Sequence, residues 1–268
     1  YEAIIPGLLK RWYAERQEMR KKMRDSGDNE IEREYWDKRQ LVKKINLNSL
    51  YGAILNPGCR FFDMRIGQSV TLSGRCITKH MASKVNEIVA GKYDHKGESV
   101  VYGDTDSVYF SAYKTLQKEI KDGLIPWTKD SILGLYDKIS DEVNTSFKAF
   151  MTKAFHTPAT RGEVIAAGRE LVASKGLFIT KKRYAVLYYD KEGKRTDVEG
   201  KEGKMKAMGL DLKRSDTPVF VQDFLSEILY MVLSGKEEKE VLDRISEFRA
   251  DFKSRPGWEK GSPKRANN

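Results

Sequence analysis

Residues 102–107 read Tyr-Gly-Asp-Thr-Asp-Ser, and short apolar runs at 99–102 and 108–113 flank the centre of this stretch. The apolar runs predict two strands, and Gly103 with the two aspartates predicts the turn between them. Segments with helical periodicity lie on both sides of this hairpin. The sequence therefore predicts an α+β fold with antiparallel strands.

Asp104 and Asp106 stand two residues apart in this predicted turn. On a strand their side chains would share a face, and in a turn they could converge on one hard cation. Mg²⁺ prefers such oxygen ligands, and a pair of these ions is the arrangement that polymerases use for phosphoryl transfer. A solvated turn is the alternative, because Asp and Gly are common turn residues. A calcium EF-hand is excluded, because its sixth position requires Gly and Tyr109 stands there.

The rest of the chain is mostly helical in pattern. The first two helices are predicted over 2–24 and 30–55, separated by a turn cluster at 25–29, and they form a helical hairpin. Further helices are predicted over 67–90, 130–155, 217–233 and 236–253. A second β-hairpin is predicted over 176–195, with its turn at 190–193.

One face of the second helix carries Lys44, Asn48 and Tyr51, which follow the i, i+4, i+7 spacing. A cation, an amide and a flat ring on one stripe suit a nucleotide. Arg16 and Arg20 share a face of the first helix and could add guanidinium groups to the same triphosphate. The alternatives are a half-buried amphipathic face for the first set and a solvated charged face for the arginines.

Lys181-Lys182-Arg183-Tyr184 is predicted to lie on a strand of the second hairpin. Three consecutive cations on a strand point to both faces, which suits a polyanion running past. The alternative is a charged edge strand that guards against aggregation.

The composition supports a polyanionic partner. The chain has 268 residues, with 49 Lys and Arg against 39 Asp and Glu, which gives a net charge of +10. Such a balance on a folded chain favours nucleic acid. Two cysteines and three scattered histidines exclude a disulfide framework and a zinc ribbon and indicate a reducing setting. No apolar run is long enough to predict a membrane span.

Three of these motifs together resemble the family B DNA polymerases, and within them those of T-even-like bacteriophages. Asn48-Ser49-Leu50-Tyr51-Gly52 is similar to the fingers motif B, residues 102–107 to the palm motif C, and residues 181–184 to the Lys-Lys-x-Tyr element. The resemblance implies a fingers helical hairpin over 1–54, an antiparallel-sheet palm with flanking helices over 55–212, and the helical start of a thumb over 213–268.

The resemblance also implies an activity, namely template-directed transfer of a nucleotide from a deoxynucleoside triphosphate to a primer 3′-hydroxyl. The implied setting is the cytoplasm of an infected bacterial host. The implied partners are primer-template DNA and the triphosphate, with Mg²⁺ as cofactor. By resemblance, the site residues are Asp104 and Asp106 for metal and catalysis, Arg16, Arg20, Lys44, Asn48, Tyr51 and Gly52 for the nucleotide, and Lys181, Lys182, Arg183 and Tyr184 for DNA. Glu170 matches an acidic residue near the metals only weakly.

Two family features are missing from the sequence. The motif A string Asp-x-x-Ser-Leu-Tyr-Pro-Ser, which supplies the other metal-binding aspartate, does not occur, and the Asp-Ile-Glu exonuclease motif is absent too. The chain is therefore expected to be a piece of a polymerase or one subunit of a split enzyme. Its candidate partners are an N-terminal polymerase subunit carrying motif A and a sliding clamp. The alternatives are a non-catalytic nucleic-acid-binding module and a basic structural protein whose matches are accidental.

Overall fold

The computed structural model describes residues 3–198 and 200–262, so the last six residues of the predicted thumb segment lie outside it. The described chain forms two compact units, one ending at Ile77 and the next beginning at Thr78. The described chain consists of helices and antiparallel strands, which confirms the α+β prediction.

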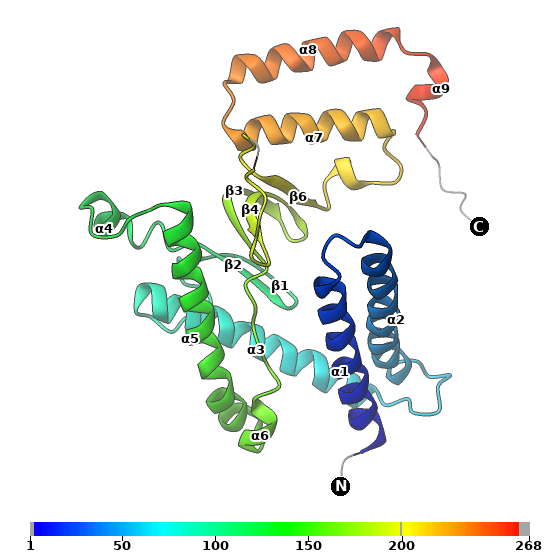
Figure 1. Cartoon of the computed structure of the whole chain (residues 1–268), viewed down its shortest axis with the longest axis vertical. Coiled ribbons are helices and arrows are strands. Elements are labelled where there is room, and N and C mark those ends of the chain that lie inside the picture. The colour runs from blue at the N-terminus through cyan, green and yellow to red at the C-terminus, as the bar shows by residue number, and fades with distance from the viewer. Residues whose placement is uncertain (1–2, 199, 263–268) are drawn as a thin grey trace. The chain divides into compact units, whose positions relative to one another are not determined.

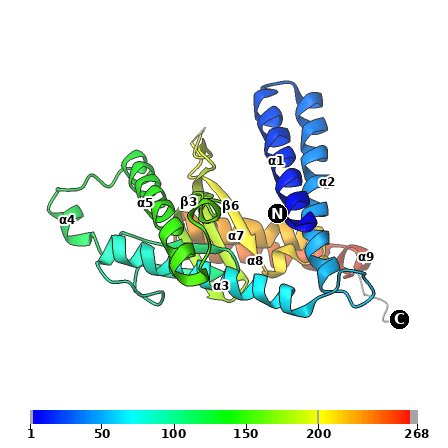
Figure 2. The same cartoon turned by 90° about the horizontal axis from the view of Figure 1, so that it is seen from below.

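The first unit is built on a helical hairpin. Helix α1 spans Ile4–Asp25 and helix α2 spans Glu30–Ile54, and the two run side by side (Figures 1 and 2). The Asn29 side chain caps α2 by accepting a hydrogen bond from the backbone N–H of Glu32 at 3.1 Å. Glu30 and Glu32 lie in the first turn, where negative charge favours the helix dipole. These bounds agree with the predicted helices within two residues.

Polar contacts join the two helices of this hairpin. The Lys43 ammonium lies 2.5 Å from the Glu15 carboxylate, and the Arg16 guanidinium donates to the Gln40 side chain at 3.2 Å. Helix α3 spans Met64–Ala90 and begins in the first unit. The compact unit thus ends within α3, at Ile77, later than the end of the predicted fingers segment at residue 54.

The second unit has a helical layer. The later part of α3 packs with helix α5, which spans Lys129–Phe155, and both contribute buried apolar side chains. The His80 ring stacks on Phe150 and lies within hydrogen-bond distance of the Tyr93 and Ser146 hydroxyls, at 2.8 and 2.9 Å. Two short helices, α4 at Gln117–Lys121 and α6 at Ala159–Gly162, were not predicted from the sequence.

The strands of this unit form two antiparallel sheets. Strands β1 (Val100–Asp104) and β2 (Ser107–Phe110) make a two-stranded sheet. Strand β4 (Arg183–Lys191) is the buried centre of the second sheet and pairs with its three other strands, which are β3 (Leu171–Thr180), β5 (Lys194–Arg195) and β6 (Lys204–Met208). The register pairs Thr180 with Arg183, so β3 and β4 form a tight hairpin.

The β3–β4 turn corrects the sequence prediction. Lys181 and Lys182 were expected on a strand, but they form the two-residue turn, and Lys182 takes a left-handed φ of 61°. Neither residue is a usual left-handed turn residue, so the local sequence gives no turn signal. The predicted turn after Asp190 is confirmed, with left-handed backbone at Glu192 and Gly193.

The C-terminal helices pack on the second sheet. The 3₁₀ turn Asp211–Lys213 leads to helix α7 (Val219–Ser234), whose Leu233 packs against Ala185 and Leu187 of β4. Helix α8 (Glu238–Ser254) contacts α7 through stacked Phe224 and Phe248 rings, 3.7 Å between centroids, and a short helix α9 follows at Gly257–Lys260. No helix in the described part of the chain has the length and apolar character needed to cross a bilayer.

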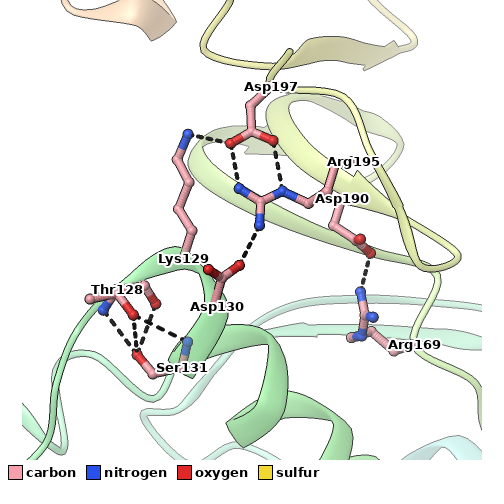
Figure 3. A network of polar contacts seen from close by, with 8 residues as sticks. All are labelled: Thr128, Lys129, Asp130, Ser131, Arg169, Asp190, Arg195 and Asp197. Atoms are coloured by element: carbon pink, nitrogen blue, oxygen red, sulfur yellow. Dashed lines mark hydrogen bonds and ion pairs between the residues drawn. The ribbon is translucent and has the colours of Figure 1, made fainter.

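Charged side chains tie the start of α5 to the second sheet (Figure 3). The Asp197 carboxylate accepts from the Arg195 guanidinium and from the Lys129 ammonium, each at 2.7 Å. Arg195 also donates to Asp130 at 2.5 Å. The hydrogen bonds that Asp197 accepts hold the pKa of its carboxyl well below the ordinary value, and the bond from Arg195 has the largest effect.

Candidate functional site

The acidic turn, defined as residues 104–106, closes the β1–β2 hairpin. Asp104 pairs with Ser107 across the hairpin, which leaves Thr105 and Asp106 as a two-residue loop. Thr105 takes a positive φ of 32°, as the first loop residue of a primed hairpin turn does. Its carbonyl accepts a hydrogen bond from the Thr78 hydroxyl of α3 at 2.9 Å. The turn is thereby held by α3 as well as by its own strands.

The two carboxylates differ in exposure. Asp104 is half-buried at the end of β1 and accepts from the Thr105 hydroxyl at 3.1 Å, whereas Asp106 is exposed. Their oxygens are the ligands that Mg²⁺ prefers, so the donor chemistry of the turn fits this ion. Among the described residues, no cluster of three or more His, Cys, Asp or Glu side chains is arranged to hold a metal. The acidic turn therefore fits part of a metal site.

A cleft of about 510 Å³ opens beside the acidic turn. Strand β2, helix α5 and the first part of β3 line it, and it includes Asp106 and Glu170. The Glu170 carboxylate lies 2.8 Å from the Lys206 ammonium of β6. Burial, and then the hydrogen bond with Tyr184, raises the pKa of the Tyr109 phenol on the cleft wall above its ordinary value.

The basic turn, defined as residues 181–183, closes the β3–β4 hairpin with three exposed cations. The next residue, Tyr184, is only 4% exposed. Its ring therefore packs inside the protein in this structure, while the three charged side chains face solvent. The sequence predicts DNA contacts for all four residues, and in the structure Tyr184 differs from the three cations by its burial.

An aromatic tetrad lies directly behind both turns. It consists of Tyr102 and Tyr109 from the β1–β2 hairpin and Phe178 and Tyr184 from the β3–β4 hairpin. The Tyr102 hydroxyl accepts a hydrogen bond from the backbone N–H of Lys182 at 2.8 Å. The structure therefore brings the acidic and basic turns together within one unit, although their motifs lie far apart in the sequence.

The predicted nucleotide-binding residues all belong to the first unit. Lys44 and Asn48 are exposed on α2, one turn apart, and Gly52 has open space where a Cβ would stand. Tyr51 is half-buried and its hydroxyl donates to the Gly67 carbonyl at 3.3 Å. Lys44, Asn48 and Tyr51 therefore lie on α2 as predicted, and Tyr51 is anchored near the C-terminal end of the helix.

Arg16 and Arg20 lie on α1 and are both half-buried. The Arg16 Nε donates to Gln40 of α2, so this guanidinium already has one partner within the hairpin.

Two further residues shape the two turns and were not predicted from the sequence. Thr78 supports the acidic turn through its hydrogen bond to the Thr105 carbonyl. Gly209 allows the basic turn to pack closely, because a Cβ at this position would lie 2.0 Å from the Lys182 carbonyl oxygen.

Comparisons with known proteins show which family the chain belongs to. The sequence model described as DNA polymerase family B matches residues 1–124 and 141–255. The DNA-directed DNA polymerases of Escherichia phage RB69 and Enterobacteria phage T4 are 32% and 31% identical over 209 and 211 residues, in each case 74% of this chain. The DNA polymerase alpha catalytic subunit of Dictyostelium discoideum is 27% identical over 254 residues, which is 92% of the chain.

The chain belongs to DNA polymerase family B. It spans only part of each relative, namely 22% of the RB69 polymerase, 23% of the T4 polymerase and 14% of the Dictyostelium subunit. The matched region includes the acidic turn and the basic turn, so both turns belong to the shared part of the family.

Proposed function

We propose that the chain takes part in template-directed DNA synthesis as a segment or subunit of a viral replicative DNA polymerase. The reaction is transfer of a nucleotide from a deoxynucleoside triphosphate to a primer 3′-hydroxyl, in the cytoplasm of an infected bacterial host. The observation that carries this proposal is the joining of an acidic turn to a basic turn within one unit of a family B chain. Such a pair suits metal-assisted chemistry on a nucleic-acid backbone.

Each turn has a distinct role in this proposal. Asp104 and Asp106 hold Mg²⁺, which when bound neutralises charge that develops on a phosphate. The exposed cations of the basic turn hold the phosphates of primer-template DNA. Tyr184 supports that turn from beneath, because its ring is buried.

The α1–α2 hairpin has the third role, which is capture of the incoming nucleotide. Lys44 and Asn48 present a cation and an amide to solvent from one face of α2, as a triphosphate requires. Arg16 and Arg20 add guanidinium groups from α1. Tyr51 and Gly52, at the end of the same face, contact the nascent base pair.

A second candidate function is a nucleic-acid-binding module with no activity of its own. The observation that favours it is the small number of metal ligands at the acidic turn. Among the described residues, the two aspartates are not joined by a third His, Cys, Asp or Glu side chain that could complete a metal site. The sequence also carries no motif A string. A partner polypeptide that carries motif A would complete the metal site, and a sliding clamp is a further candidate partner.

Primer extension separates these two functions. The chain is assayed with primed template, deoxynucleotides and Mg²⁺, first alone and then with a separately expressed polypeptide that carries motif A. We expect almost no incorporation by the chain alone and clear incorporation by the mixture. An Asp106→Asn chain in the same mixture is the control for contaminating polymerase.

DNA binding is measured in parallel, by fluorescence anisotropy of a labelled primed duplex. A protein that contacts several phosphates loses affinity steeply between low and moderate salt, with a slope near −0.9 per phosphate on a logarithmic plot. Salt-dependent binding without incorporation in any mixture would favour the binding module. Binding that does not change with salt would contradict both functions.

A further inference from the structure

The aromatic tetrad is built from two cross-strand pairs. Tyr102 pairs with Tyr109 in the β1–β2 hairpin, and Phe178 pairs with Tyr184 in the β3–β4 hairpin. Each ring lies against the other three, with all six centroid distances between 5.3 and 6.0 Å. Such ring pairs favour fixed relative orientations. The two hairpins are therefore packed into one structural element next to the acidic and basic turns.

The tetrad stands immediately behind the two turns. Tyr102 precedes Asp104 by two residues on β1, and Tyr184 follows Lys182 by two residues on β4. The Tyr102 hydroxyl accepts the Lys182 N–H at 2.8 Å, while the Tyr109 hydroxyl donates to that of Tyr184 at 3.3 Å. Only the first of these two hydrogen bonds reaches the backbone of the basic turn.

The basic turn needs outside support. Lys182 has a φ of 61°, a left-handed conformation that residues with a Cβ adopt at a cost. On one side its N–H is held by Tyr102, and on the other its carbonyl lies so close to Gly209 that no Cβ would fit there. The conformation of Lys182 is thus set by contacts from β1 and from the end of β6.

We propose that the Tyr102 hydroxyl fixes the basic turn relative to the acidic turn and that Tyr102 is a positioning residue for primed DNA. One hydrogen bond joins the strand that carries Asp104 to the turn that carries Lys182. A polyanion held at the basic turn is thereby kept at a constant offset from the two carboxylates. This inference rests on the proposed function, because it assigns DNA phosphates to Lys182.

The test compares two variants that each lose one hydroxyl and keep the ring. Tyr102→Phe removes the acceptor of the Lys182 N–H, and Tyr109→Phe removes the hydroxyl that contacts Tyr184. Both variants are made in the full chain, and their melting temperatures measure any general loosening of the tetrad. Binding of a labelled primed duplex is then titrated at several salt concentrations.

We expect Tyr102→Phe to weaken duplex binding by about three- to tenfold, the range that the net value of one hydrogen bond allows. Tyr109→Phe should change it by less than about twofold, since its hydroxyl makes no contact with the turn backbone. Lys182→Ala should lower the salt slope by about one.

A direct readout of the contact is the hydrogen-exchange rate of the Lys182 amide, which should rise in Tyr102→Phe and stay unchanged in Tyr109→Phe. The outcomes separate the two claims. If Lys182→Ala binds DNA like the parent chain, the basic turn does not hold DNA. That result would refute both the DNA-binding role given to this turn in the proposed function and the positioning role of Tyr102. If Lys182→Ala weakens binding while Tyr102→Phe does not, the positioning role is overturned and the proposed function stands.

Discussion

Replacement of Arg169 by Met should strongly destabilise the second unit. The guanidinium joins two carboxylates that differ sharply in exposure, since the Asp190 side chain is 2% exposed and that of Asp137 is 52% exposed (Figure 3 shows the buried partner). With Met at 169, the buried carboxylate would lose its cationic partner and retain the hydrogen bond from the Gly193 N–H, at 3.2 Å. Removing one member of a buried ion pair costs about 3–5 kcal/mol.

The matched control is Asp137→Asn, which breaks the exposed half of the same pairing. A pair of that exposure is worth about 0–1 kcal/mol, so the two variants should differ by at least about 2 kcal/mol. Urea unfolding followed by circular dichroism measures both free energies. Adding Asp190→Leu to Arg169→Met should recover most of the loss, because no buried charge then remains. Equal losses in Arg169→Met and Asp137→Asn would refute the reasoning.

Three further predictions concern the site and its support. Asp106→Asn should slow primer extension in the complemented assay by at least about 10²-fold, by analogy with the loss of one electrostatic donor, while the melting temperature hardly moves because the side chain is exposed; near-normal extension would contradict the metal assignment. Lys44→Ala and Asn48→Ala should raise the nucleotide KM and leave duplex affinity unchanged; an equal loss of duplex affinity would place α2 on the DNA track instead. Asp197→Asn should destabilise the fold at neutral pH, and the gap from the parent should begin to narrow as pH falls below about 4, because the pKa of Asp197 is depressed in the folded state, so that its stabilisation is fully present above the unfolded value and is lost progressively as pH falls toward the folded value. A gap that stays constant between pH 7 and pH 3 in thermal melts would count against this ion network.

The helices and the acidic turn could be predicted because their signals are local. The turn cluster at 25–29 predicts a second helix from residue 30, where α2 begins, and the predicted helix over 130–155 differs from α5 by one residue. The acidic turn contains Gly103 and two aspartates, which are turn residues by their own conformational preferences. These features need no knowledge of the rest of the chain.

The remaining features depend on residues distant in sequence. The strand β6 is only five residues long, too short for the alternation of Lys204 and Lys206 with apolar residues to indicate a strand, and it forms because β4 offers a paired edge. The burial of Tyr184 follows from the three rings around it, two of which come from another hairpin. Local propensity could not separate this tyrosine from the three exposed cations before it.

The left-handed turn at Lys182 also bears on the order in which the chain folds. Most tight hairpin turns favour their own closure, whereas this one depends on Tyr102, 80 residues earlier, and on Gly209 at the far end of β6. Contacts of such sequence separation are slow to form, so we expect β3 and β4 to pair only after β1 is in place. A Gly209→Ala substitution should therefore speed unfolding and leave the folding rate nearly unchanged, the kinetic signature of a contact made after the rate-limiting step. The hairpin that carries the proposed DNA contacts would then be a late part of the domain to become ordered.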